Sequence, residues 1–365
     1  MSVLCKVLNT LLEIRLTQFR NYGNAHFIFP ETITCITGPN GSGKTSLLDA
    51  VYYLCYSKSY FSVQQQHSVQ SGTEGFRVEG QFEPSNQPVT IVCKWREGKK
   101  ELSADGIIYD RVTEHIGRFA AVMIAPDDMV MIHEGSEGRR RWMDSILGQT
   151  DRKYLEDLMT YQRVLLQRNA WMKLQSLRPS ETRTELQYYD QELSRTGQYI
   201  HQKRTHFLED FKPLLTDCYD QLSNRNEKVS IEYLSDQNHT TLATSLLQSF
   251  EQDLRFQRTT KGIHRDDLVF LIQDKPLKQY GSQGQKKSFL FALKLAQYQY
   301  LASHQGRKPI LLLDDVFEKL DQQRMESLLR IIQGTGFGQV ILTDTHPERV
   351  RMAFSSGTQM GEIHL

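Results

Sequence analysis

The sequence predicts an α/β protein with two lobes, and three observations support this expectation. First, 365 residues are more than most single compact cores contain, so a second lobe is expected. Second, the first and last thirds of the chain both mix strand-like apolar segments with helical segments, as a shared α/β core would. Third, glycine nearly vanishes between about residues 151 and 222, where long helical stretches with many charged and polar residues dominate.

The first 120 residues are expected to form the N-terminal part of the larger lobe. Strands are predicted at 11–16, 26–29 and 32–37, with Pro30 as a break. The segment 46–56 is too densely apolar for an exposed helix and predicts a buried one. Residues 75–109 return to short strands separated by turn signals, which indicates an antiparallel β-subdomain.

Residues 263–365 are expected to complete the same α/β core. The apolar pattern predicts helices at 285–303 and 322–333 and strands at 310–313 and 339–343. These segments again alternate between helix and strand. The early and late parts of the chain should therefore share one core.

The middle of the chain, residues 121–262, is expected to form a smaller helical lobe. Tyr154, Leu158, Tyr161 and Leu165 are spaced by four, three and four residues, which places them on one face of a helix. A loop around Pro179 would let two helices pack as a short antiparallel hairpin. The chain leaves no room for a long coiled coil.

Composition predicts no partner by itself. Lys and Arg number 44 and Asp and Glu number 43, so any attraction to nucleic acid must come from clustering of charge. The five cysteines are scattered without a paired spacing, which fits a reducing cytoplasm. We see no export signal and no membrane-spanning stretch, so we expect a cytoplasmic protein that has no membrane partner.

A glycine-rich loop carries the strongest chemical signal. Residues 38–45, GPNGSGKT, match the pattern G-x-x-x-x-G-K-[ST] between a predicted strand and a predicted helix. Backbone N–H groups and the positive end of the helix would converge there on the phosphates of ATP. Lys44 would neutralise the β- and γ-phosphates, and Thr45 would bind Mg²⁺. The expected phosphate contacts are Gly38, Pro39, Asn40, Gly41, Ser42, Gly43, Lys44, Thr45 and Ser46.

Two acidic residues follow the apolar run Ile310–Leu313, which reads as a buried parallel strand. Placed beside the glycine-rich loop, Asp314 would hold Mg²⁺ directly or through water. Asp315 could orient or deprotonate the attacking water. Acids also end strands at surfaces for structural reasons, so the loop upstream is what favours this interpretation.

The segment Tyr280–Lys287, YGSQGQKK, precedes a helix and looks like the signature motif of ABC ATPases. In that class, a serine and the N-terminus of a helix donate to the γ-phosphate held by another subunit. Ser282, Gly284 and Gln285 would make these contacts here. Such a site is complete only in an ATP-dependent homodimer.

Two further segments fit this scheme. Residues 318–321, EKLD, follow the acids where ABC proteins carry a D-loop, so Asp321 is a further expected contact. His346 follows the next strand, where a histidine that senses the γ-phosphate is found, although a histidine there is often merely exposed. No glutamine can be assigned to a Q-loop.

These motifs together resemble the bacterial RecF family nearly end to end. The resemblance also rests on FRNY at 19–22, APDD at 125–128, EGRRRWMD at 137–144 and HRDD at 264–267. It implies a P-loop ATPase head of the ABC type, with Arg20 and Asn21 as further nucleotide contacts. It also implies an ATP-dependent DNA-binding dimer that acts with RecO and RecR to load RecA at single-strand gaps. Because Asp315 is shorter than the usual glutamate, we expect slow ATP turnover.

Binding to DNA has little direct support in the sequence. Candidate phosphate contacts are Arg139, Arg140, Arg141, Lys286, Lys287 and the stretch 58–61. Runs of charge are usually solvated faces, so the family resemblance decides in favour of sequence-independent binding to double-stranded and gapped DNA.

Two other classes of protein remain as alternatives. A transporter's nucleotide-binding subunit would place a compact insert between the loop and the signature, whereas a long stretch separates Gly43 from Ser282 here. An SMC-like structural clamp shares the head but requires a long coiled coil.

Overall fold

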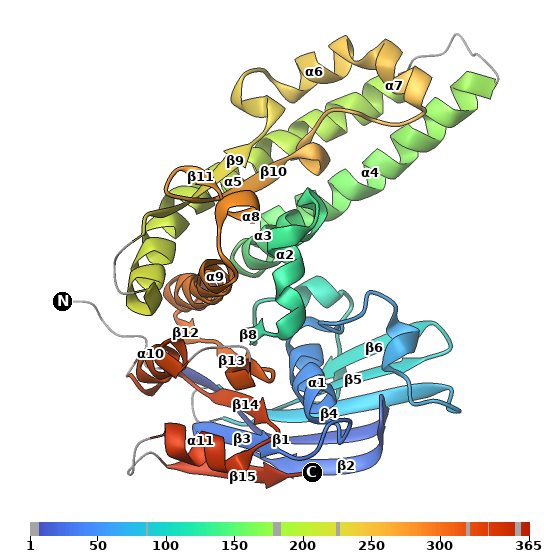
Figure 1. The fold of residues 1–365 in the computed structure, drawn as a ribbon. Helices are drawn as coiled ribbons and strands as arrows, with labels where there is room; N and C mark the ends of the chain where they lie inside the picture. Colours follow the sequence, from blue (N-terminus) through green and yellow to red (C-terminus); the bar gives the residue numbers. More distant parts are fainter. Residues whose placement is uncertain are drawn as a thin grey trace. The chain divides into compact units, whose positions relative to one another are not determined.

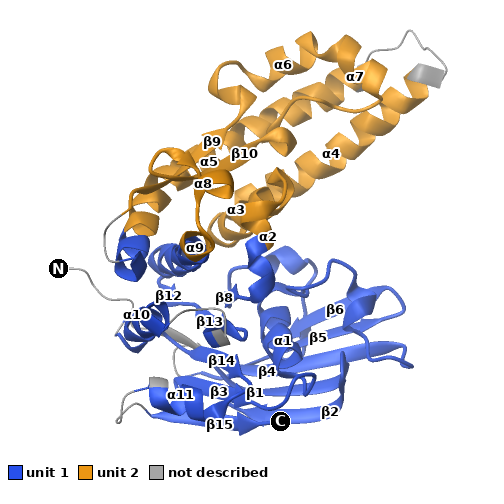
Figure 2. Cartoon of the chain, in the orientation of Figure 1, with its two compact units in different colours: residues 1–129, 217–226, 287–365 blue, residues 130–216, 227–286 orange. Residues whose placement is uncertain are grey.

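A computed structural model describes residues 7–84, 87–177, 184–223, 227–318, 322–334, 336–354 and 359–365. The chain forms two compact units (Figures 1 and 2). Unit 1 comprises residues 1–129, 217–226 and 287–365, and unit 2 comprises residues 130–216 and 227–286. The α/β class with a head and a helical lobe is confirmed. None of the described helices combines the length and apolar character that crossing a membrane requires.

The centre of unit 1 is a parallel sheet of five strands in the order β15-β3-β14-β13-β8. Its strands are β3 (Ile33–Thr37), β8 (Ala121–Ile124), β13 (Ile310–Leu313), β14 (Val340–Asp344) and β15 (Met360–His364). Every residue of β3, β8, β13 and β14 is buried, as expected where helices or other layers cover both faces of a parallel sheet. The early and late parts of the sequence therefore meet in one sheet.

A second sheet in unit 1 is built mainly from antiparallel strands in the order β12-β1-β4-β5-β6-β7, with β2 paired to β1. The strands are β1 (Val7–Phe19), β2 (Tyr22–Ile28), β4 (Gly75–Pro84), β5 (Val89–Arg96), β6 (Lys99–Ala104), β7 (Ile107–Ile108) and β12 (Arg307–Lys308). This sheet is the β-subdomain expected from 75–109. It extends further than expected, because β1 also joins it.

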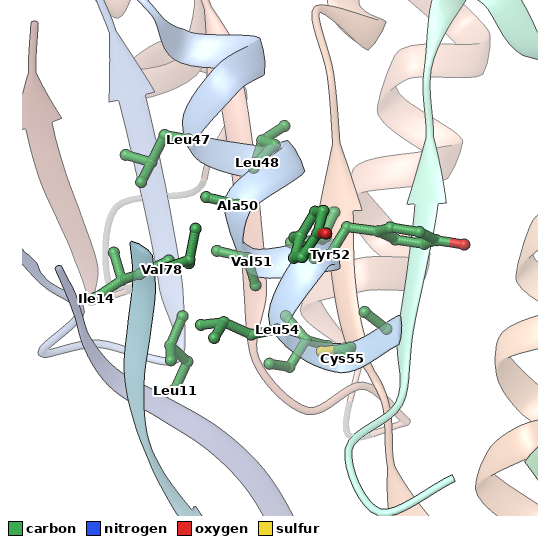
Figure 3. Close-up of a cluster of buried hydrophobic side chains, with 14 of the residues drawn as sticks. Leu11, Ile14, Leu47, Leu48, Ala50, Val51, Tyr52, Leu54, Cys55 and Val78 are labelled. Atoms are coloured by element: carbon green, nitrogen blue, oxygen red, sulfur yellow. The ribbon is translucent and has the colours of Figure 1, made fainter. Parts of the chain in front are cut away.

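Helix α1 (Lys44–Tyr56) holds the core of unit 1 together. Its side chains Leu47, Ala50, Val51 and Leu54 lie among Leu11, Ile14 and Val78 of β1 and β4 (Figure 3). Burying aliphatic side chains of this size stabilises a fold by roughly 1.5–3 kcal/mol each. The apolar packing of α1 in this core thus fixes the position of the helix that follows the glycine-rich loop.

Further α-helices of unit 1 lie in its C-terminal segment. They are α10 (Gln322–Gln333), α11 (Pro347–Ala353) and the part of α9 (Gln283–Gln305) from residue 287 onward.

Unit 2 contains a helical hairpin and a small sheet. The hairpin helices are α4 (Arg152–Leu177) and α5 (Thr184–Ser223), and α5 continues into unit 1. The ion pairs Arg168–Asp190 and Arg195–Asp157 show that the two helices run antiparallel. At 40 residues, α5 is about 60 Å long, so the hairpin is longer than the short one expected. Most of the predicted connecting loop, including Pro179, lies outside the described residues.

Unit 2 also contains a three-stranded sheet and several shorter helices. The sheet has the order β11-β10-β9, formed by β9 (Val229–Leu234), β10 (Asp267–Ile272) and β11 (Lys275–Pro276). The helices are α2 (Val130–His133), α3 (Ser136–Thr150), α6 (Leu242–Gln248), α7 (Phe250–Phe256) and α8 (Leu277–Tyr280).

Candidate functional site

The parallel sheet of unit 1 gathers the predicted site residues at one edge. In the paired registers, Leu313 of β13 lies beside Leu342 of β14, which lies beside Cys35 of β3. The carboxyl ends of these strands therefore meet, and ligands of open α/β sheets bind at such an edge. The glycine-rich loop (residues 38–45) follows β3, and Asp314 and Asp315 follow β13.

The glycine-rich loop has a conformation that requires glycine at its end. Gly43 has φ = 113°, and a Cβ there would lie 2.7 Å from the hydroxyl oxygen of Tyr22. That hydroxyl donates to Gly43 O at 3.1 Å, and Asn21 Nδ2 donates to Ser42 O at 3.4 Å. The turn between β1 and β2 therefore supports the loop from one side.

Lys44 is the most unusual charge of the site. Lys44 is 4% exposed, and its Nζ donates to Gly38 O at 2.9 Å and to Pro39 O at 3.1 Å. Within the described part of the chain, no carboxylate lies within ion-pair distance of this ammonium group. Neutral carbonyls orient a buried cation without neutralising it, so the ammonium can attract an anion to the loop.

Thr45, Asp314 and Thr343 form a hydrogen-bonded cluster beside the loop. Thr45 Oγ1 donates to Asp314 Oδ1 at 3.0 Å, and Thr343 Oγ1 lies 3.0 Å from the same oxygen. Burial raises the pKa of Asp314 to about 6, while hydrogen bonds from the two threonines oppose this rise. A cation bound here would favour the ionised carboxylate.

The donor atoms of this cluster fit Mg²⁺. Asp314 and Thr45 offer oxygen ligands at the same point, and Mg²⁺ usually takes one or two protein ligands together with substrate phosphates. Nowhere in the described ranges do three or more His, Cys, Asp or Glu side chains gather as an all-protein metal site. Ser42 Oγ in the loop is buried and has no described hydrogen-bond partner, which suits a loop built to contact phosphates.

Asp315 adopts a backbone conformation that is uncommon for a non-glycine residue, with φ = 45°. Its backbone N–H donates to Thr343 Oγ1 at 2.9 Å. Thr343 thus contacts both acids and holds them together at the ends of β13 and β14. Its role was not predicted, because a threonine within an apolar strand gives no sequence signal.

Arg20 and Asn21 lie in the turn between β1 and β2 but have different partners. Asn21 contacts the glycine-rich loop, whereas the Arg20 guanidinium pairs with Asp49 of α1 at 2.7 Å and bonds Ser59 Oγ at 3.0 Å. Arg20 therefore links the turn to the helix behind the loop. Pro39, Asn40 and Gly41 are exposed, and Ser46 is half-buried in the first turn of α1.

His346 lies at the end of the same sheet edge, just after β14. Its side chain is 64% exposed, and its Nδ1 lies 2.8 Å from Thr345 Oγ1. Its backbone N–H donates to Asp344 Oδ1 at 2.7 Å, which fixes the residue at the start of α11. Asp344 is fully buried and was not singled out from the sequence. Asp321 of the expected D-loop lies outside the described residues.

Ser282, Gly284 and Gln285 lie in unit 2, where Ser282 is exposed just before α9. Ser282 and Gln285 are hydrogen-bonded to each other at the start of this helix. The structure thus brings the other described site residues together in unit 1 and places these three in a separate compact unit.

Three of the candidate DNA contacts are buried or bonded within the fold. Arg139 is buried and makes a bidentate ion pair with Asp267 at 2.8 and 2.9 Å. Arg140 donates to Asp266 O at 2.6 Å, and Lys286 is 8% exposed. The sequence did not reveal the burial of Arg139 and Lys286 or the partners of Arg139 and Arg140, and contact of these three residues with DNA stays a prediction.

The other candidates are mixed. Arg141 and Lys58 are exposed, and Arg141 pairs with Glu137. Tyr60 bonds Asp128 and accepts from Lys294 Nζ at 2.7 Å, so it belongs to the interior of unit 1.

Comparison with known proteins identifies the family. Residues 10–360 match the model of the RecF/RecN/SMC N terminal domain. The DNA replication and repair protein RecF of Flavobacterium johnsoniae is 40% identical over 97% of this chain and 99% of its own length. The RecF protein of Cytophaga hutchinsonii is 38% identical over 95% of this chain and 92% of its own length.

Solved structures agree with this match. The recombination mediator protein RecF-ATPrS in the RecFOR pathway has a TM-score of 0.86 and 28% identity, covering 98% of this chain and 96% of that one. The corresponding RecF-ATP structure also has a TM-score of 0.86, with 30% identity over 93% of this chain and 92% of that one. An Smc head domain from Pyrococcus furiosus shares the fold, with a TM-score of 0.54, 15% identity, and coverage of 95% and 92% of the two chains. The chain belongs to the RecF family of DNA replication and repair proteins.

Proposed function

We propose that this chain is a recombination mediator that binds ATP with Mg²⁺, dimerises on ATP and hydrolyses it slowly when DNA is bound. The observation that carries this proposal is the buried Lys44 ammonium, whose hydrogen bonds among the described residues go to backbone carbonyls, beside the Thr45–Asp314 pair. A triphosphate would supply the missing negative charge, and Mg²⁺ would join it to the acid. The relatives in the RecF family support the same assignment.

The residues would divide the chemistry among them. Lys44 would bind the β- and γ-phosphates, Thr45 and Asp314 would hold Mg²⁺, and Asp315 would orient the attacking water. The short Asp315 side chain reaches less far than a glutamate, which fits slow turnover. His346 would sense the γ-phosphate. The further nucleotide contacts proposed within one subunit are Arg20, Asn21, Gly38, Pro39, Asn40, Gly41, Ser42, Gly43 and Ser46.

A second copy would complete each site. Ser282, Gly284, Gln285 and Asp321 of one subunit would contact the triphosphate held by Lys44 of the other. ATP then acts as a clamp between two copies, and hydrolysis releases them, because the triphosphate contacts both copies only in the dimer. The bound dimer would hold DNA through phosphate contacts without reading sequence, so its affinity should fall steeply with salt.

The biological setting follows from the family and is part of the same proposal. We propose that the dimer acts in the cytoplasm on double-stranded and gapped DNA, together with RecO and RecR, and helps to load RecA at single-strand gaps. The RecF structure similar to this chain is described as part of a RecFOR pathway. Membership of the RecF family disfavours the two alternatives, a transporter subunit and an SMC-like structural clamp.

Light scattering on a sizing column tests the dimer and the site together. The wild-type chain should change from monomer to dimer mass with ATP and Mg²⁺, and EDTA should reverse the change. Lys44→Ala should remove ATP binding and dimerisation. Ser282→Arg should keep ATP binding but block dimerisation, because a long cation would replace the small donor at the shared face.

Matched variants serve as controls. Lys99→Ala removes an exposed lysine of unit 1, and Gln248→Arg adds the same charge at an exposed position of α6. Both should dimerise like the wild type. Unchanged dimerisation of Lys44→Ala would overturn the proposal, and so would DNA binding that is independent of salt.

A further inference from the structure

The turn before α9 holds Ser282 in a reciprocal pair of hydrogen bonds with Gln285. The Ser282 backbone N–H donates to Gln285 Oε1 at 2.7 Å, and the Gln285 backbone N–H donates to Ser282 Oγ at 3.2 Å. This arrangement is a capping box, which satisfies two N–H groups at the start of a helix. It also determines which way the serine hydroxyl faces.

The hydroxyl of Ser282 keeps its own proton for another acceptor. Its oxygen accepts from Gln285 N, and no described residue accepts the hydroxyl proton within hydrogen-bond distance. Ser282 is exposed, so this proton can be donated to a group outside the chain. The direction of the Ser282 hydroxyl therefore depends on the position of Gln285.

Gln285 is itself fixed by an acid from a distant part of unit 2. Its Nε2 donates to Glu227 Oε1 at 2.6 Å, a charge-assisted hydrogen bond. A carboxylate can only accept, so this contact requires the NH₂ group of the amide to face Glu227. The amide oxygen must then face Ser282 N, which is the orientation that the capping box needs.

Glu227 lies next to the three-stranded sheet of unit 2. It lies just before β9, and Val229 of β9 is paired with Ile272 of β10. The neighbouring Lys228 is held through its backbone O, which accepts from Gln273 N at 2.8 Å, and through its Nζ, which lies 3.0 Å from Asp274 Oδ1. These contacts fix the chain on the C-terminal side of Glu227 to the sheet, which helps to hold the Glu227 carboxylate in place.

We propose that Glu227 is a positioning residue for Ser282, acting through Gln285 to aim the serine hydroxyl at the phosphate bound by a second copy of the chain. The inference rests on the proposed function, in which Ser282 contacts that phosphate. Glu227 itself touches neither nucleotide nor metal. Its loss should therefore weaken the joining of two copies and leave ATP binding by one copy intact.

The test compares Glu227→Ala with Glu227→Gln and with Glu232→Ala. Glu232 is an exposed acid on β9 and serves as the matched control. A fluorescent ATP analogue measures binding to the monomer, and light scattering measures the ATP concentration at half-maximal dimerisation. Glu227→Ala should leave the first quantity unchanged and raise the second about tenfold, the scale of one charge-assisted hydrogen bond.

Two further variants separate positioning from general damage to the fold. Glu227→Gln keeps an acceptor oxygen and should dimerise within about twofold of the wild type. Adding Glu227→Ala to Gln285→Ala should have no further effect, because both residues act through one chain of bonds. Dimerisation of Glu227→Ala equal to that of Glu232→Ala, or an additive double variant, would overturn the inference. If Ser282→Arg also dimerises normally, the proposed function itself fails.

Discussion

Replacing Arg204 by Met should destabilise unit 2 strongly, because this one guanidinium neutralises two acids. Arg204 lies on α5 and is 1% exposed. Its Nη2 is 2.9 Å from Asp144 Oδ1 of α3, and its Nη1 is 3.0 Å from Asp266 Oδ2 and 2.9 Å from Ile263 O. Met would keep most of the aliphatic packing and remove the charge.

The size of the effect follows from what remains after the substitution. Removing one partner of a buried ion pair usually costs about 3–5 kcal/mol, because the other charge stays buried. Here two carboxylates stay, but the hydroxyls of Tyr154 and Tyr233 still donate to Asp144 and Asp266 respectively. We therefore expect a loss of about 3–5 kcal/mol in the free energy of unfolding of unit 2, rather than twice that value.

Urea denaturation at pH 7, followed by tryptophan fluorescence, measures this loss. Trp142 and Trp171, two of the three tryptophans, lie in unit 2. The control is Arg195→Met on the same helix, where a 53% exposed guanidinium pairs with Glu192 and Asp157. An exposed pair contributes at most about 1 kcal/mol. The reasoning is refuted if the two variants unfold at the same urea concentration.

Two further predictions concern unit 1. Burial lowers the pKa of His115 to about 4, and its Nε2 lies 2.6 Å from Leu54 O, so the neutral ring is the folded form. In the unfolded chain, this imidazole has its ordinary pKa near 6.5 and takes up a proton below that pH. The free energy of unfolding is therefore highest above pH 6.5, and it falls by up to about 3 kcal/mol as the pH drops towards 4. In His115→Gln, the urea concentration at half-unfolding should change less between pH 6.5 and 4 than in the wild type. An unchanged slope would contradict the role given to His115. Gly43→Ala should weaken ATP binding more than about tenfold, because its Cβ would meet Tyr22 in a left-handed backbone. Gly98→Ala has a similar backbone strain with open space around it and should bind ATP like the wild type, as titration with a fluorescent analogue would show.

The sequence predicted the elements around the candidate site well because their signals are local. The strand Ile310–Leu313 and the helix Gln322–Gln333 have the expected bounds. A continuous apolar run of this length fits a strand buried in a parallel sheet. Likewise the glycine-rich loop carries its own conformational requirement at Gly43. Local patterns of this kind can be recognised without knowing how distant segments of the chain pack.

Side-chain partners were harder to predict because they come from distant segments. Arg139 looked like part of an exposed basic run, yet its partner Asp267 is 128 residues away. Thr343 and Tyr22 contact the site through a hydroxyl, and no sequence pattern announces such a contact. The length of α5 was missed because its apolar positions repeat loosely and Pro213 lies inside the helix.

Two buried lysines of unit 1 differ in the groups that contact their ammonium, and this difference distinguishes a structural lysine from one proposed to bind a ligand. Lys44 and Lys294 are 4% and 3% exposed. Lys294 Nζ lies 3.1 Å from Asp128 Oδ1, so its charge is neutralised within the fold, whereas Lys44 Nζ contacts the carbonyls of Gly38 and Pro39. A buried cation whose direct contacts are neutral carbonyls costs free energy that an anion bound beside it would offset. This placement of Lys44 at the first turn of a helix suits the anion proposed to bind there, and such binding would make the fold more stable.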